Sequence, residues 1–233
     1  LEVTLLKFTP DPERTAALAA KLCYSDSSIA GLTSKLSSAQ NHGASTEKLL
    51  GRILKMGHTS VLEHASFTFG IEGISRVTSH QLVRHRLASY SQQSQRYVKP
   101  SRPDYVTPDT IAKDPEKKRV FDEMVKDVYA LYKDLTDAGV PAEDARYILP
   151  NAACTKIIVT MNARELLHFF KLRCCERAQW EIREMATRML ALVKKEAPFI
   201  FKYAGPACVE TSCSEGDMTC GKPKEIKEKF KKL

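Results

Sequence analysis

The sequence predicts an α+β fold in a single domain, with a mostly antiparallel sheet packed by helices. Two observations support this prediction. The chain has 233 residues, of which 43% are hydrophobic, and this length is enough for one well-buried core. Strand-like and helix-like apolar patterns are interspersed along it, without a regular strand–helix–strand repeat and without any internal repeat.

Three segments have the pattern of strands. Residues 3–8 and 66–71 are short apolar or alternating runs, and residues 157–161 form a run rich in β-branched side chains. We expect the third of these strands to be buried. Between them, residues 25–43 are rich in serine and lack periodicity, which predicts a loop with a short helix.

Helices are predicted from caps and apolar spacing. One opens near residues 11–12 and runs toward residue 22, and a second is capped by Ser45 or Thr46 and ends at Gly57. Residues 74–83 also look helical, whereas residues 98–114 contain several prolines and predict a surface loop.

The longest helix follows Pro115 and ends at Gly139. Its apolar residues recur at intervals of three and four, which predicts one stripe facing the core, with a cofactor groove and a subunit contact as the alternatives. Further on, Asn162 and Glu165 match a capping box, and a last helix covers residues 178–195. The predicted stripe of the longest helix consists of Phe121, Met124, Val128, Leu131 and Leu135.

The net charge of +8 is concentrated at the C-terminus. Residues 222–232 hold six Lys and two Glu, so this stretch carries half of the excess. We interpret residues 1–220 as the folded domain and residues 221–233 as a Lys-rich tail that is solvated or disordered. Because no apolar run has the length of a membrane span and no signal-peptide pattern is present, we expect a cytoplasmic protein without membrane contact.

The seven cysteines show no disulfide framework. Cys208, Cys213 and Cys220 lie near the C-terminus with four and six residues between them, which is not the spacing of a zinc ribbon. The sequence therefore predicts reduced thiols and no metal site.

The most informative motif is Arg84-His85-Arg86, which leads into nine residues, 89–97, without an aliphatic side chain. A guanidinium group can bind phosphate through two parallel hydrogen bonds, and hydroxyl and amide groups can hydrogen-bond to the edge of a heterocycle. These properties indicate a nucleotide ligand. The structural alternative is a basic helix end followed by an ordinary polar loop.

Phosphate binding would have to rely on side chains, because the chain has neither a Gly-x-Gly-x-x-Gly fingerprint nor a Walker loop. Arginines that gathered without an anion would be unfavourable, so convergence would require an anionic partner. The arginines available for this are Arg84, Arg86, Arg96, Arg146, Arg164 and Arg173.

The spacing from Arg84-His85-Arg86 to Ser94 resembles the signature of the flavin-dependent thymidylate synthases. Further matching segments lie at residues 57–64, 145–150, 162–164 and 172–181, so the resemblance covers roughly residues 50–185. It implies reductive methylation of dUMP to dTMP, with methylenetetrahydrofolate as one-carbon donor, FAD as hydride carrier and NADPH as reductant. It also implies that residues 1–220 form a catalytic domain that assembles as a homotetramer.

The resemblance assigns roles to individual residues. Arg173 corresponds to the residue that polarises the uracil and favours its ionisation, Ser94 would orient the uracil, and His58 would lie near flavin and folate. Gln92, His168 and Arg177 depart from the residues common in the family, which puts individual flavin contacts in doubt. The implied dUMP-binding set is Gln81, Arg84, Gln92, Gln93, Ser94, Gln95, Arg96, Arg146 and Arg173, and the implied FAD-binding set is Ser60, Arg84, His85, Arg86, Gln92, Asn162, Arg164 and His168.

The sequence leaves two rival functions beside the enzyme. A nucleic-acid-binding module would use the basic central loop, with Tyr90 and Tyr97 as stacking platforms. A nucleotide-binding regulator without catalysis is the other, and the presence of Arg146, Arg173 and Ser94 argues against it. We expect small-molecule substrates and no nucleic acid as partners.

Overall fold

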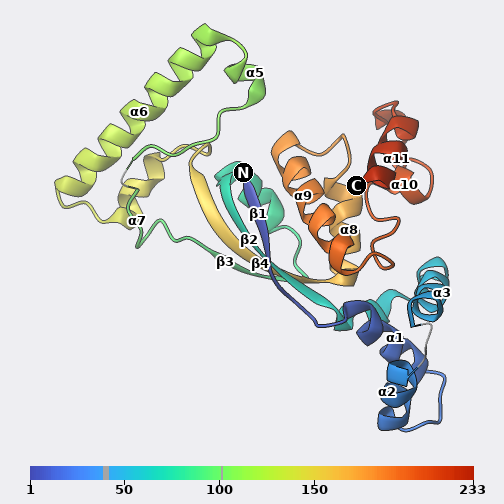
Figure 1. Cartoon of the computed structure of the whole chain (residues 1–233). Coiled ribbons are helices and arrows are strands. Elements are labelled where there is room, and N and C mark those ends of the chain that lie inside the picture. The colour runs from blue at the N-terminus through green and yellow to red at the C-terminus, as the bar shows by residue number, and fades with distance from the viewer. Residues whose placement is uncertain (39–41, 101) are drawn as a thin grey trace. The chain divides into compact units, whose positions relative to one another are not determined.

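The computed structural model describes residues 1–38, 42–100 and 102–233, and it confirms the α+β prediction (Figure 1). Its sheet has four antiparallel strands in the order β1-β2-β4-β3. The chain forms two compact units, one of residues 1–2, 71–84 and 90–158, and another of residues 3–70, 85–89 and 159–233. They are called the first and the second unit below, and the boundary between them falls within all four strands.

The three predicted strands are confirmed as β1 (Glu2–Phe8), β2 (Ser66–Ser75) and β4 (Cys154–Asn162), with β2 and β4 longer than predicted. The fourth strand, β3 (Ala88–Gln92), was not predicted, because its residues are mostly polar. It is an edge strand, where polar side chains are tolerated. The first part of the supposed polar loop is therefore a strand.

The N-terminal helices are α1 (Pro12–Leu22), α2 (Ile29–Ser38) and α3 (His42–Lys55), followed by the 3₁₀-helix η1 (Thr59–His64). The prediction that Ser45 or Thr46 caps α3 is wrong, because both lie inside the helix. Gly57 ends it as predicted, with a φ of 73° that suits glycine. The Ser-rich stretch contains α2, and its residues 39–41 lie outside the described part of the chain.

The helix predicted at residues 74–83 is α4 (Arg76–Leu82), shorter because the first two predicted residues belong to β2. The Ser75 hydroxyl caps it by accepting a hydrogen bond from the backbone N–H of Thr78 at 3.2 Å. This cap turns the chain from strand to helix, so that the helix ends directly before the Arg84-His85-Arg86 motif.

The predicted surface loop at residues 98–114 contains the short helix α5 (Asp109–Ala112), which packs on α6 (Pro115–Asp137). α7 (Ala142–Ala145) and the 3₁₀-helix η2 (Arg146–Ile148) contact α6 as well. α6 is the longest helix, and α5 and α7 lie near its opposite ends (Figure 1). Gly139, with a φ of 90°, follows it as predicted.

The predicted core stripe of α6 is wrong for two of its residues. Met124 is 62% exposed and Leu131 is 51% exposed, whereas Val125, Tyr129 and Tyr132 are buried. The buried face is formed in part by tyrosines, whose rings bury well and whose hydroxyls can find a partner. The buried face of α6 is therefore rotated by about one residue, and an apolar strip stays at the surface.

The C-terminal part contains α8 (Ala163–Arg173), α9 (Trp180–Glu196), α10 (Ala207–Glu210), the 3₁₀-helix η3 (Gly216–Met218) and α11 (Pro223–Lys232). The Lys-rich tail is thus a helix rather than a disordered end. Ile226 and Phe230 of α11 are buried, and α11 packs beside α10 (Figure 1). No helix of the described residues combines the length and the apolarity that a membrane crossing requires.

Candidate active site

Arg173, to which the resemblance assigns the polarisation of the uracil, is held by the histidine of the Arg84-His85-Arg86 motif. Its Nε donates a hydrogen bond to Nε2 of His85 at 3.0 Å. Arg173 is the last residue of α8, and His85 follows α4, so the link joins positions 88 apart in the second unit. The guanidinium is half-buried, whereas the imidazole is only 5% exposed.

Glu165, one turn into α8, contacts the other side of the same ring. Its Oε1 lies 3.4 Å from Nδ1 of His85, and its side chain is buried. Burial raises the pKa of Glu165, and the nearby His168 opposes this effect. The sequence predicted that Glu165 takes part in a capping box at the start of this helix. In the structure its side chain also contacts His85.

His85 is uncharged at neutral pH, because burial, then the charge of Arg173, then His168 lower its pKa from 6.5 to about 4. A neutral imidazole has one N–H and one acceptor nitrogen. Since Nε2 accepts from Arg173, Nδ1 carries the proton and points it at Glu165. The contact with Glu165 is therefore a long hydrogen bond to a neutral ring rather than a pair of full charges. His85 also packs edge-on against Phe169, with ring centroids 4.9 Å apart.

Asn162 caps α8, as the sequence predicted. Its side-chain oxygen accepts from the backbone N–H of Glu165 at 2.9 Å, and this arrangement leaves the amide nitrogen for another contact. Arg164 lies in the first turn, is exposed and forms an ion pair with Glu63. Glu63 and His64 are both exposed.

The other predicted residues of the second unit lie at its surface. His58 immediately precedes η1, Ser60 is within it, and His168 is on α8, and all three are exposed. His168, together with Thr59, which lies between His58 and Ser60 in the sequence, lines a groove of about 1050 Å³. Arg86 is exposed too, and among the described residues the structure gives it no ion-pair partner.

In the first unit, Arg96 and Arg146 meet at one residue, Glu143. Arg96 donates from Nε to a Glu143 carboxylate oxygen at 2.8 Å, and Arg146 donates from Nε to the Glu143 carbonyl oxygen at 3.0 Å. Arg96 also stacks over the ring of Tyr97. Two guanidinium groups that are far apart in sequence are thus placed around one acidic residue.

A role for Arg76 was not predicted from the sequence. It begins α4 and is half-buried, and burial followed by the charge of Arg146 lowers its pKa. Two like charges close together favour an anion between or beside them. The signal available in the sequence was its position in the first turn of a capped helix, where a basic residue opposes the helix dipole.

Ser94 shows no sign of being a nucleophile. It is half-buried, and its hydroxyl accepts from the backbone N–H of Arg96 at 3.2 Å, which is a local turn contact. Gln92 is half-buried, and its amide nitrogen donates to Ser79 and Thr155, both at 3.1 Å. The side chain of Gln92 therefore ties β3 to its neighbours as well as being a predicted ligand contact.

The remaining predicted dUMP-binding residues differ in exposure. Gln81 on α4 and Gln95 are half-buried, whereas Arg84 and Gln93 are exposed. Of the six arginines expected to converge, Arg84, Arg96 and Arg146 belong to the first unit and Arg86, Arg164 and Arg173 to the second. Each unit thus has its own set of cations, and convergence of all six stays a prediction.

The residues of the second unit suit a flavin dinucleotide. Exposed Arg86, Arg164 and His168 offer positive or donor groups for a pyrophosphate, and the half-buried amide of Asn162 can donate to a ring oxygen or phosphate. The arginines of the first unit suit a nucleoside monophosphate. These features indicate a class of protein that binds two phosphorylated nucleotides through side chains.

Comparison with known proteins identifies the family of the chain. Residues 4–199 match the family model described as Thymidylate synthase complementing protein. Over its full length the chain is 56% identical to the flavin-dependent thymidylate synthase of Geobacter sulfurreducens, covering 99% of that protein. It is 47% identical to the flavin-dependent thymidylate synthase of Clostridium tetani, with 98% of this chain and 96% of that protein covered. The flavin-dependent thymidylate synthase of Pyrococcus furiosus is 46% identical, with 100% and 98% covered.

The chain therefore belongs to the flavin-dependent thymidylate synthase family, and it is an enzyme.

Proposed function

We propose that the enzyme methylates dUMP reductively to dTMP, taking the one-carbon unit from methylenetetrahydrofolate, with NADPH as the reductant. FAD, when bound, supplies the hydride that converts the transferred methylene to a methyl group. Membership of the family supports the reaction class. The observation that carries the mechanism is the hydrogen bond that fixes Arg173 on His85.

Arg173 is proposed to polarise the uracil. Its Nε donates to His85, so the guanidinium is held in a fixed direction. A fixed positive charge stabilises a developing anion on the uracil without a proton transfer. The neutral state of His85 matters, because a protonated ring has no acceptor for Arg173.

Ser94 is proposed to orient the uracil, and Arg96 and Arg146 to hold the phosphate of dUMP with Arg84. The proximity of Arg76 to Arg146 supports an anion site here. The ion pair between Arg96 and Glu143 is exposed and therefore weak, so a phosphate can replace the carboxylate at little cost. For the other residues of the implied dUMP-binding set, we propose the binding role that the resemblance implies. His58 is likewise proposed to lie near flavin and folate.

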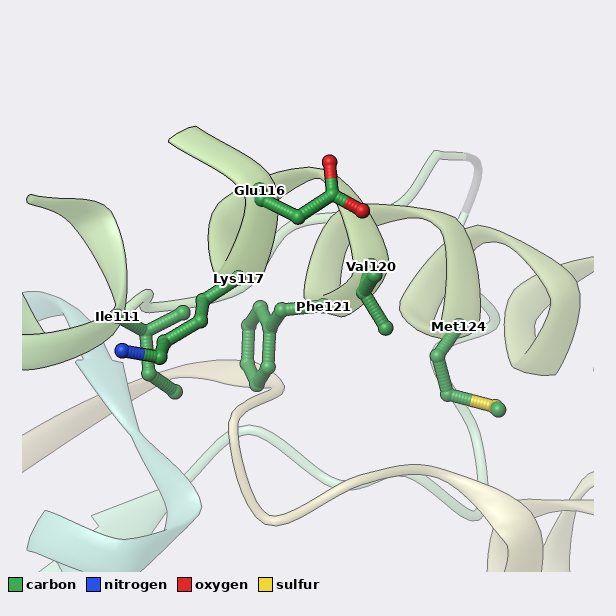
Figure 2. Close-up of a pocket in the computed structure, with 6 residues that line it drawn as sticks. All are labelled: Ile111, Glu116, Lys117, Val120, Phe121 and Met124. Atoms are coloured by element: carbon green, nitrogen blue, oxygen red, sulfur yellow. The ribbon is translucent and has the colours of Figure 1, made fainter. Parts of the chain in front are cut away.

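A homotetramer is proposed on the basis of the exposed apolar strip of α6. Val120 is 52% exposed and Met124 is 62% exposed. Figure 2 shows both beside Phe121 along one side of the helix, with Ile111 of α5 nearby. They line a depression of about 550 Å³ that contains none of the predicted site residues. Apolar surface of this kind is typical of subunit contacts.

Two further predictions remain: that residues 1–220 form the catalytic domain, and that the enzyme is located in the cytoplasm.

The first experiment is the visible spectrum of the purified chain after incubation with FAD and removal of free flavin. A retained flavin spectrum is expected, followed by formation of dTMP from dUMP, methylenetetrahydrofolate and NADPH. A colourless protein would overturn the proposal that this chain binds FAD, and a flavin-containing protein that forms no dTMP would overturn the proposed reaction.

The nucleic-acid-binding alternative is weakened by the geometry. The hydroxyl of Tyr90 donates to the carbonyl of Leu82 at 2.9 Å and the ring is half-buried, so only Tyr97, which is 79% exposed, is available for stacking. One exposed ring does not make a platform for successive bases.

A further inference from the structure

The groove that His168 and Thr59 line belongs wholly to the second unit and is rich in lysine. Helices α3, α8, α10 and α11 all contribute to its walls. Six lysines and two glutamates are among the residues that line it, so its positive side chains exceed the negative ones by four. It is called the lysine groove below, and its lysines are Lys48, Lys55, Lys171, Lys202, Lys227 and Lys231.

Most of this positive charge is not balanced inside the groove. Nζ of Lys202 lies 2.8 Å from Oε1 of Glu47, which forms one ion pair. Among the described residues, the structure shows no ion pair for the other five lysines. Glu210, the second acidic residue of the groove, is exposed and offsets one charge at most. The groove therefore has a positive potential that favours an anionic ligand.

The helix dipole accounts for part of the lysine content without a ligand. Lys55, Lys171 and Lys231 are in the last turns of their helices, where a cation is stabilised by the partial negative charge of the helix end. Lys48 is in the middle of α3 and Lys227 is in the middle of α11, where this stabilisation is absent. Lys227 is also half-buried, so a ligand is the better explanation for these two.

The wall formed by α3 has room for an extended ligand. Lys48, Gly51 and Lys55 follow one another at intervals of three and four residues, so they lie on one face of the helix. The two lysines are about 10 Å apart along the helix axis. Gly51 leaves the space between them open, because a Cβ added there would meet no heavy atom within 4 Å. Two cations with a gap between them suit a chain of anionic groups better than one compact anion.

The Lys-rich C-terminal helix is fixed where two of its lysines reach the groove. Ile226 and Phe230 of α11 are buried, and Nζ of Lys194 on α9 donates to the Phe230 carbonyl oxygen at 2.7 Å. Lys227 and Lys231 are four residues apart and flank Phe230 on the same side of the helix. Burial of Phe230 therefore places both lysines at the groove.

Apolar side chains also line the groove. Leu54, Leu167 and Phe199 do so and are half-buried. Tyr203 lines it as well and is 58% exposed, with Nζ of Lys202 at 5.8 Å from the centre of its ring. A ligand that matches both kinds of lining has an aromatic or apolar body joined to several anionic groups.

We propose that the lysine groove binds the oligo-γ-glutamate tail of the folate co-substrate, with the p-aminobenzoyl ring against the apolar side chains and the tail carboxylates at the lysines. The inference rests on the proposed function, which makes methylenetetrahydrofolate a substrate. The other proposed ligands carry phosphates, which the planar fork of arginine suits. Lysine is a point charge on a flexible stem, and it can follow a chain of carboxylates that has no fixed geometry.

The position of the groove agrees with this occupant. Thr59, which lines it, is flanked in the sequence by His58 and Ser60, and these are proposed to lie near flavin and folate and to bind FAD. His168, which also lines it, is in the proposed FAD-binding set. A folate whose pterin ring lies at the flavin can therefore extend its tail into the groove.

The first test compares methylenetetrahydrofolate carrying one glutamate with the same compound carrying five, as substrates of the full, FAD-loaded chain. We expect KM to be about tenfold lower for the pentaglutamate at low salt. The difference should shrink as the salt concentration rises, because salt screens exposed charges. Equal KM values, with dTMP formed from both substrates, would overturn the inference and leave the proposed function intact.

A binding measurement decides the inference even if no dTMP forms. The Kd of tetrahydrofolate with one and with five glutamates is measured by calorimetry on the same FAD-loaded protein. Absence of dTMP would overturn the proposed reaction, whereas tighter binding of the pentaglutamate would still support the groove. Equal Kd values for the two compounds would overturn the inference.

Two matched double variants of α11 locate the tail. Lys227→Gln with Lys231→Gln removes two lysines of the groove, whereas Lys224→Gln with Lys232→Gln removes two exposed lysines of the same helix outside it. We expect the preference for pentaglutamate over monoglutamate to fall about threefold in the first pair and to be kept in the second. Equal losses in both would reflect general charge and overturn the assignment to the groove. A higher KM for NADPH in the first pair, with the folate preference unchanged, would overturn it as well.

Discussion

Nε of Arg173 donates to Nε2 of His85 at 3.0 Å, and this bond requires the histidine to be neutral. Glu165 lies on the opposite side of the ring and favours the proton on Nδ1. The chain Glu165–His85–Arg173 therefore orients a guanidinium through a buried ring. It explains why a histidine stands between the two exposed arginines of the Arg84-His85-Arg86 motif.

Replacement of Arg173 by Lys tests the need for a planar fork. Lysine keeps the charge, but its ammonium is a point charge without the planar geometry that the bond to His85 orients. We expect Arg173→Lys to lower kcat by about 100-fold, with flavin retention nearly unchanged. Lys171→Arg, on the exposed side of the same helix, is the control. Unchanged turnover in Arg173→Lys would remove Arg173 from the chemistry.

His85 should make the stability of the fold depend on pH. Its pKa falls from 6.5 in the unfolded chain to about 4 in the fold. The unfolded state therefore binds more protons between these values. The stabilisation is complete above pH 6.5 and is lost as the pH falls toward 4, with a total of about 3 kcal/mol in the free energy of unfolding.

The comparison that isolates this effect is denaturant unfolding of wild type and His85→Gln across that pH range. The raised pKa of Glu165 acts in the opposite direction, since it favours the fold at low pH, and it is present in both proteins. We expect a shallower loss of stability at low pH in His85→Gln than in wild type. The exposed His64→Gln should follow the wild-type curve, and identical slopes for all three proteins would contradict the assignment.

Asn162 combines a structural and a ligand-binding role that can be separated. Asn162→Ala removes the cap of α8 and should cost about 1 kcal/mol of stability. Asn162→Ser keeps a capping oxygen and should restore most of this stability, but it lacks the amide donor proposed for flavin. We therefore expect weak flavin retention in both variants, with a lower Tm only in Asn162→Ala. Asn151→Ala, at an exposed position, should change neither quantity.

Much of the fold could be predicted from the sequence wherever one local signal dominates. The cap at Asn162, the glycines at the ends of α3 and α6, and the alternating run of β2 were all visible in it. The misses have physical causes. β3 is polar because it is an edge strand, and the tyrosines of α6 bury a face that an aliphatic pattern does not show. The site is harder to predict, because the contact of Arg173 with His85 joins segments that are distant in the sequence.

Arg146 is expected to destabilise the free protein slightly while it binds the phosphate. Its charge acts on the half-buried Arg76, so Arg146→Gln relieves a repulsion. We expect the Tm of the variant without ligand to equal or exceed that of wild type. The rise in Tm caused by dUMP should be smaller, with Kd about tenfold higher. A lower Tm without ligand and an unchanged Kd would place Arg146 outside the anion site.

The proposed role of Ser94 in orienting the uracil can be tested directly. Its hydroxyl accepts from the backbone N–H of Arg96, and neither a histidine nor a carboxylate among the described residues is seen to activate it. An unactivated hydroxyl is a weak nucleophile, so Ser94→Ala should lower kcat by about tenfold without abolishing it. Binding of dUMP should weaken at most modestly, because the arginines supply most of the affinity. The assay is dTMP formation at saturating dUMP, with Ser91→Ala, on the neighbouring strand β3, as the control. Complete loss of turnover with dUMP binding intact would revive a covalent role for Ser94.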